Sequence, residues 1–215
     1  MPIGGGSFTV QNKVLPGAYI NFVSMGTNAK MGERGVAALP LELNWGPEGQ
    51  VFKLDAADFN ATSMKVFGYD PTDANILLVR EAMKRAKALL IYRVNGGGTK
   101  ASATVGGMTV TAKYGGTRGN AIKVAVITNV DDATKADVVT YLDDMVMDSQ
   151  TVAKSGGAAS LVANDFVTFG TVATLAAATA TPLTGGANAT VNAAKHTAAL
   201  TAFEVETFNV IGYPG

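Results

Sequence analysis

The residues with the clearest potential for chemistry lie in one glycine-rich stretch, AKYGGTRGNAIKV, at residues 112–124. It combines three glycines with two lysines and an arginine, a composition that can bind phosphate through backbone N–H groups and positive charge. A Walker A loop, however, requires G-x-x-x-x-G-K-[ST] before a helix, and this stretch leads into a strand-like run at residues 122–127. We therefore expect a sharp structural corner instead, in which glycines adopt positive φ and Asn120 makes local turn hydrogen bonds.

The other reactive residue types form no catalytic or metal-binding pattern. The chain has one histidine and no cysteine, which excludes disulfides, thiolate catalysis and cysteine-based metal sites. His196 shares a predicted helix face with Leu200 and Phe203 and has no assignable nucleophile, so we expect a packed, hydrogen-bonded core residue. Several aspartates lack the D-x-D-x-D-G spacing of a calcium loop and should form solvated turns. They are Asp131, Asp132, Asp137, Asp143, Asp144 and Asp148. We predict no enzyme activity, no cofactor and no metal.

The overall composition favours self-association. The 215 residues include 17 basic and 17 acidic side chains, and only 16% of the chain is charged. A neutral chain with few charges has little electrostatic repulsion between copies, and it lacks the excess of Lys and Arg that drives binding to nucleic acid. We also expect no Sec-type signal and no membrane insertion, because no basic segment precedes an apolar core and no run reaches about 18 apolar residues.

Two parts of the chain carry a helix followed by a buried strand, the pattern of a parallel α/β sheet. The first has helical spacing over residues 73–86, with a cap at Thr72 or Asp73, and an apolar run over residues 88–94. The second has a helix over residues 192–203 and a buried strand over residues 208–212.

Residues 35–43 and 51–54 are further strand-like runs, separated by the loop N-W-G-P-E-G. Pro40 interrupts the first run, which indicates an edge strand or a bulge. Trp45, within the loop, is either an exposed contact residue or a plug over the sheet.

Residues 98–186 are rich in Thr, Val, Gly and Ala and contain no convincing helix. The sequence V-G-G-M at residues 105–108 predicts a two-residue hairpin, and Asp143-Asp144 should form the turn of a second one. Other expected strands are residues 137–142, 145–152, 165–169 and 172–177. Short strands at this spacing indicate a small β-sandwich or barrel. The fold class is therefore an α/β domain interrupted by an all-β insertion, α+β overall.

We divide the chain into an arm (1–20), an α/β unit in two parts (21–97 and 187–215) and the insertion (98–186). The arm contains the turn V-L-P-G and has little to bury by itself, so it is either an interaction arm or a frayed end. The last predicted strand has no crossover after it, so we expect the chain to be part of a longer protein.

The corner stretch resembles the A-K/R-Y-P-G-x-x-G-N-x-I-x-V signature of contractile tail sheath proteins of myophages and R-type bacteriocins, with Gly115 where that pattern usually has proline. We expect a looser corner as a result. Four other stretches resemble the family in the same order along nearly the whole chain. They are LPGAYINFVS, LNWGPEGQVFKL, LTGGANATVNAAKHTAAL and FNVIGYPG. His196 stands at a position that is commonly aromatic in the family, and the likeness is greatest to sheaths of phages and defective phage particles of Gram-positive bacteria.

The resemblance implies a subtilisin-like α/β domain, without a protease site, that carries a β-sandwich insertion. In the family, the rest of the α/β domain and a C-terminal domain follow the Y-P-G turn. The implied structural corner comprises Tyr114, Gly115, Gly116, Gly119 and Asn120.

The resemblance also implies a structural subunit that polymerises as a helical sleeve around an inner tube and contracts to drive the tube through a cell envelope. Its implied partners are other copies of itself, the inner tail tube protein, and the baseplate and tail terminator proteins. Neighbours would be linked by β-augmentation through the arm residues Val14, Leu15, Pro16, Gly17 and Tyr19. Such a protein is assembled in the bacterial host cytoplasm and ends in a virion or phage-tail-like particle. The alternatives are a nucleotide-dependent or hydrolytic α/β enzyme, and a β-sandwich adhesin module, which would need a secretion signal.

Overall fold

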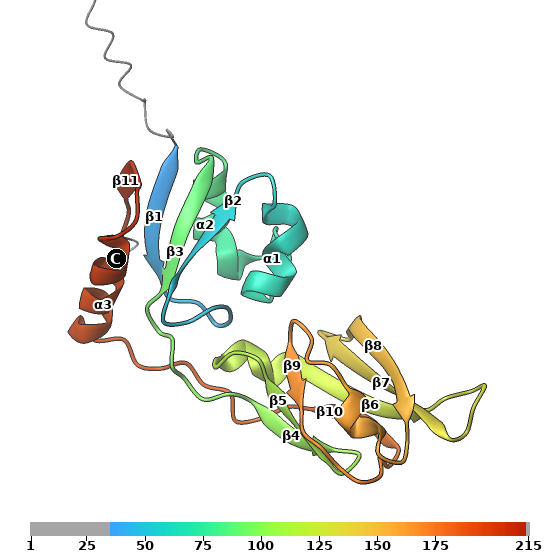
Figure 1. Cartoon of the computed structure of the whole chain (residues 1–215). Helices are drawn as coiled ribbons and strands as arrows, with labels where there is room; N and C mark the ends of the chain where they lie inside the picture. Colours follow the sequence, from blue (N-terminus) through green and yellow to red (C-terminus); the bar gives the residue numbers. More distant parts are fainter. Residues whose placement is uncertain (1–34, 214–215) are drawn as a thin grey trace, which may run out of the picture. The chain divides into compact units, whose positions relative to one another are not determined.

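The computed structural model describes residues 35–213. Four strands form the first sheet, in the order β11-β1-β3-β2 (Figure 1). Their bounds are β1 Val36–Leu41, β2 Val51–Asp55, β3 Ala88–Arg93 and β11 Val210–Ile211. β1 runs parallel to both β3 and β11, and β2 is antiparallel to β3.

Helices cover both faces of this sheet (Figure 1). Their bounds are α1 Phe59–Phe67, the 3₁₀ turn η1 Ala74–Ile76, α2 Leu77–Met83 and α3 Ala193–Phe203. Leu89 and Ile91 of β3 pack into the core with α1 and α2, whereas Leu90 and Tyr92 pack against α3. This alternation follows from the period of two along a strand. It confirms the expected strand that is buried on both faces.

Two helix starts agree with the sequence and one helix was missed. Asp73 caps η1 by accepting a hydrogen bond from Asn75 N at 2.8 Å, and Asn192 caps α3 by accepting one from Lys195 N at 3.1 Å. α1 was not predicted. Its sequence, FNATSMKVF, contains several weak helix formers. The helix is formed because Phe59, Ser63 and Phe67, spaced by four residues, are buried on one face.

β1 is not an edge strand, so the expectation from Pro40 was wrong. β1 pairs with β3 over its whole length and with β11 at Ala37 and Ala38. Val36 N bonds Asn209 on the β11 side, and the period of two puts the nitrogen of Pro40 on that same side. β11 ends at Ile211, opposite Ala38, so the missing N–H lies beyond the paired region and interrupts no hydrogen bond.

β11 is not the buried strand that was expected from residues 208–212. It is the outermost strand described in its sheet, and Val210 and Ile211 are 58% and 42% exposed. Apolar composition identified a strand here, but composition does not show whether a strand lies inside the sheet or at its edge.

The insertion folds into two facing sheets around a separate core, with orders β10-β6-β7-β8 and β4-β5-β9. The strands are β4 Ser102–Val105, β5 Met108–Ala112, β6 Ile122–Thr128, β7 Lys135–Leu142, β8 Met145–Ala153, β9 Val167–Phe169 and β10 Ala178–Pro182. Two 3₁₀ turns, η2 Thr117–Ala121 and η3 Gly157–Ser160, complete it. The expected sandwich is therefore present.

Both predicted hairpins are confirmed. Gly106 and Gly107 join β4 to β5 with φ of 58° and 89°, and Asp143 and Asp144 join β7 to β8 with φ of 49° and 66°. The strand expected over residues 172–177 is wrong, because β10 begins at Ala178. In residues 172–177, Leu175 N bonds Lys154 O and Ala176 N bonds Gly106 O, so these bonds go to two separate loops and form no ladder.

Within residues 35–213, no helix is long and apolar enough to cross a membrane. The same residues contain no group of three or more His, Asp or Glu side chains that could hold a metal ion.

Candidate functional site: the junction around the glycine-rich corner

The chain passes between the α/β sheet and the sandwich twice, through residues 95–101 and residues 183–189. The two passages lie side by side, because Ala187 N donates to Thr99 O at 3.0 Å and Ser102 N donates to Thr184 O at 2.9 Å. Gly116 N also donates to Thr99 O, at 3.1 Å. The predicted corner therefore packs directly on both connections.

The corner is packed closely, contrary to the looser arrangement expected from glycine in place of proline. A Cβ on Gly115 would lie 2.4 Å from Gly98 O. Gly116 has φ of +135°, and a Cβ there would lie 2.2 Å from Asn44 O. Both positions thus need glycine for the close approach of another backbone, and Gly116 needs it for its conformation as well.

Asn120 does not make the local turn bonds that the sequence suggested. Its side chain instead donates to Gly186 O at 2.9 Å and accepts from Gly186 N at 2.8 Å. This pair of bonds reproduces the hydrogen bonding of a strand partner. It ties the corner to the second connection, 66 residues away in sequence.

Trp45 is the plug that one of the two predictions described, but it plugs the sandwich and not the α/β sheet. Its side chain is 1% exposed and belongs to the sandwich core. The indole meets the Tyr114 ring edge-on at 5.3 Å and stacks on Phe166 at 6.4 Å, measured between ring centroids. Its Nε1–H finds no acceptor among the described residues. Burial, together with the charges of Asp165 and Glu48, raises the pKa of Tyr114.

Arg93, at the end of β3, is a buried cation that the sequence did not single out. It is 1% exposed. Its guanidinium donates to Gly46 O at 3.2 Å, to Asn95 Oδ1 at 3.2 Å and to Asn188 Oδ1 at 3.3 Å. Burial lowers the pKa of Arg93, and the charge of Glu48 partly offsets this. Arg93 therefore holds together the loop after β1 and both connections.

Arg118 is held by several partners, so it is not available to an incoming phosphate. Its Nε donates to Gly68 O at 2.6 Å, and its Nη1 and Nη2 pair with the two carboxylate oxygens of Asp143. Its guanidinium carbon lies 4.3 Å from the centroid of the Tyr69 ring. Arg118 lies within η2, a 3₁₀ turn of only five residues, which agrees with a structural corner.

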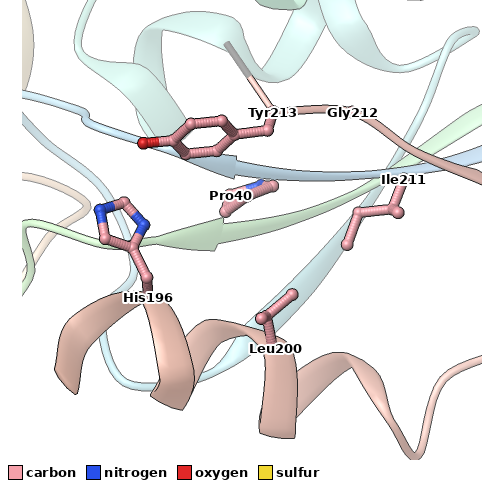
Figure 2. Close-up of a pocket in the computed structure, with 6 residues that line it drawn as sticks. All are labelled: Pro40, His196, Leu200, Ile211, Gly212 and Tyr213. Atoms are coloured by element: carbon pink, nitrogen blue, oxygen red, sulfur yellow. The ribbon is translucent and has the colours of Figure 1, made fainter. Parts of the chain in front are cut away.

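His196 lies apart from this junction and is not a hydrogen-bonded core residue, so that expectation was wrong. It is half-buried on α3 and meets the Tyr213 ring edge-on at 5.5 Å. Figure 2 shows both side chains, with Leu200 and Ile211, around an apolar groove of about 360 Å³. Pro40 and Gly212 complete its lining. The buried residues of α3 are Ala199 and Phe203, which lie four residues apart on the face toward the sheet. Leu200 is 54% exposed.

The expectation of solvated turns was wrong for Asp137 and Asp148, which lie half-buried on β7 and β8. Asp132 accepts from Thr134, and Asp137 accepts from Thr151 and Asn129. These side-chain bonds lower the pKa of both carboxyl groups. The predicted arm residues Val14, Leu15, Pro16, Gly17 and Tyr19 lie outside the described residues.

The comparisons with known proteins agree with one another. Residues 34–94 match the family described as "Tail sheath protein Gp18 domain III N-terminal region", and residues 96–188 match "Phage tail sheath protein beta-sandwich domain". The chain belongs to the phage tail sheath family. The two matches together cover the junction except for residues 95 and 189.

Two solved sheath tail proteins share this fold. The sheath tail protein of Desulfitobacterium hafniense has a TM-score of 0.79 and 42% identity. The similarity covers 93% of this chain and 46% of that protein's chain. The sheath tail protein of Listeria innocua has a TM-score of 0.75 and 37% identity. The similarity covers 86% of this chain and 41% of that protein's chain.

Two Bacillus subtilis proteins are similar over 99% of this chain: the uncharacterized protein YqbK, 38% identical, and the phage-like element PBSX protein XkdK, 36% identical. The chain spans about half the length of these relatives, 48% of each. Its role in the sheath family is structural.

Proposed function

We propose that the protein forms part of a contractile tail sheath, a helical sleeve that surrounds an inner tube and shortens to drive the tube through a target cell envelope. The observation that carries the proposal is the match of residues 34–94 and 96–188, in order, to sheath family segments, together with TM-scores of 0.79 and 0.75 to solved sheath tail proteins.

The junction supports a mechanical role over an enzymatic one. Its polar side chains, Arg93, Asn95 and Asn188, bond to one another and to backbone within the protein, and none is presented as an unpaired nucleophile or base in a cleft. The glycine-rich corner instead joins the connections between two folded parts. We therefore propose that the protein is not an enzyme and needs no cofactor.

Identical subunits form an open helix when their contacts join different surfaces and do not close into a ring. In the proposed mechanism, the arm of residues 1–20 adds a strand to a neighbour's sheet, with Val14, Leu15, Pro16, Gly17 and Tyr19 in the contact. Subunits then re-dock between an extended and a contracted arrangement while the arms keep them linked. No nucleotide is required, because the energy is stored during assembly.

The partners in this proposal are further copies of the protein, the inner tail tube protein, and the baseplate and tail terminator proteins. Assembly takes place in the bacterial host cytoplasm, and the product is a virion or a phage-tail-like particle, including R-type bacteriocins. The similarity to a protein of a phage-like element fits either kind of particle.

Deletion of residues 1–16 from the full-length protein tests the arm. We expect subunits that fold normally but fail to form linked sheaths, as seen by electron microscopy of particles. A deletion of residues 2–6 alone, which leaves the V-L-P-G turn in place, serves as the control and should still give sheaths. Normal extended sheaths that contract without residues 1–16 would exclude the arm as the link.

A further inference from the structure

Arg118 connects the glycine-rich corner to the C-terminal end of α1. Its Nε bonds the carbonyl of Gly68, the residue that ends α1 in the left-handed conformation with φ of 74°. Its guanidinium also lies over the ring of Tyr69, a cation–π arrangement. A single side chain of the sandwich thus makes two contacts with the segment that follows α1.

Asp143 sets the direction of that side chain. The carboxylate binds both terminal nitrogens of Arg118, and the Nη1 to Oδ1 distance is 3.0 Å. Because a guanidinium is planar, a two-point contact on its outer edge fixes the direction in which Nε points. The Arg118 side chain is 11% exposed and the Asp143 side chain is 54% exposed, so solvent reaches this contact mainly from the side of the carboxylate.

The turn that carries Asp143 is built in an unusual way. Asp143 and Asp144 are the non-glycine residues with positive φ among residues 35–213. Such hairpins prefer Asn, Asp or Gly at the first of these positions and Gly at the second, so Asp144 is the unusual residue. Each carboxylate has a cation: Asp143 binds Arg118, and Asp144 binds Lys123 at 2.6 Å. The Asp144–Lys123 pair joins two residues of the sandwich, whereas Arg118 of the Asp143–Arg118 pair also contacts the end of α1.

Other contacts between α1 and the sandwich are less directional. Met64 packs against the sandwich core, and Lys65 pairs with Asp165 at 3.0 Å. Both charged side chains of that pair are largely exposed, at 62% and 44%, and exposed pairs contribute little. Within the connections, Gly97 and Gly185 have positive φ and room around them, so the backbone can turn there. Gly96, Gly98 and Gly186 are closely packed.

We propose that Arg118, oriented by Asp143, is a latch that fixes the angle between the sandwich and the α/β sheet. Asp143 is a positioning residue in this device, and Gly68 and Tyr69 are the receiving surface. The latch goes beyond the proposed sheath function and does not depend on it, since it is a property of the single chain.

Distance measurements between two spin labels test the latch on the 215-residue chain. The chain has no cysteine, so labels attach only at introduced sites. Leu78→Cys on α2 and Thr104→Cys on β4 replace exposed residues, one on each side of the junction. Pulsed electron–electron double resonance then gives the distribution of distances between the two labels. For the otherwise unchanged protein this distribution should have one narrow peak.

Asp143→Asn should at least double the width of that distribution. Asp144→Asn is the matched control, because it makes the same change in the same turn, also removes an ion pair, and keeps a residue that tolerates positive φ. It should leave the distribution narrow. Arg118→Lys, which keeps a charge for Asp143 but lacks Nε and the planar group, should broaden it as Asp143→Asn does.

The latch is overturned if Arg118→Lys gives the narrow distribution of the unchanged protein. It is equally overturned if Asp144→Asn broadens the distribution as much as Asp143→Asn, because general loss of charge at the turn would then be the cause. Circular dichroism checks the fold of each variant. If Asp143→Asn fails to fold, Arg118→Lys alone decides between the two results.

Discussion

Replacing Trp45 by alanine should destabilise the sandwich, although Trp45 belongs to the loop after β1. The indole is 1% exposed and packs within the sandwich core against Tyr114 and Phe166. Truncation of a buried Trp to Ala typically costs about 3–5 kcal/mol. The edge-on contact with Tyr114 accounts for about 0.5–1.5 kcal/mol of this. We expect a loss within the range for a buried Trp.

Trp45→Phe is the control that separates packing from polarity. Phenylalanine keeps one aromatic ring and removes the Nε1–H, which has no acceptor among the described residues. An unpaired buried N–H costs about 1–3 kcal/mol, so its removal offsets part of the lost contact. The loss for Trp45→Phe should therefore be less than half that for Trp45→Ala.

Urea unfolding of the 215-residue chain, followed by far-ultraviolet circular dichroism, measures both losses. Because the chain has one tryptophan, fluorescence of the unchanged protein reports the junction alone and should follow the same transition as circular dichroism. The reasoning is refuted if Trp45→Ala lowers the free energy of unfolding by no more than about 0.5 kcal/mol, the level of an ordinary surface change, or if Trp45→Phe is as harmful as Trp45→Ala.

Three further predictions follow from the structure. Gly116→Ala should cost well over about 2 kcal/mol, because its Cβ would lie 2.2 Å from Asn44 O, whereas Gly156→Ala, with φ of +71° and open space, should cost only about 1–2 kcal/mol of backbone strain; thermal unfolding compares them. Asp137, whose folded-state pKa is lowered by bonds from Thr151 and Asn129, stabilises the fold above its unfolded pKa, and this contribution is lost as the pH falls through the folded pKa. Asp137→Asn should therefore flatten the loss of stability below about pH 4 in a pH titration of Tm. Finally, residues 98–186 alone should fold but with lower stability than in the intact chain, since they lack Trp45; an excised segment without β-structure by circular dichroism would contradict the proposed domain boundary.

Local pattern was sufficient for much of the fold. The continuous apolar run that became β3, the glycine pair at residues 106–107 and the Asp143-Asp144 turn each follow from neighbouring residues, so periodicity and turn chemistry identified them. The same applies to the cap at Asp73.

The elements that were missed depend on tertiary contacts. α1 gains its stability from burial of Phe59 and Phe67 and not from helix propensity. β11 is exposed because of its position in the sheet order, which no local pattern encodes.

The site shows the same division. The corner residues were found through glycine content, but the partners of Asn120, Trp45 and Arg93 lie in distant segments. The single signal that could have marked Arg93 is a charged residue at the end of an otherwise apolar strand.

Labelling of whole particles tests the central claim most directly. Antibodies raised against residues 98–186 would be applied to tailed particles from a host that makes the full-length protein, and gold-labelled particles would be viewed by electron microscopy. A sheath subunit predicts label along the whole length of the tail, over a shorter length in contracted particles. Label confined to the head, the tail tip or fibres, or label on no particle at all, would contradict it.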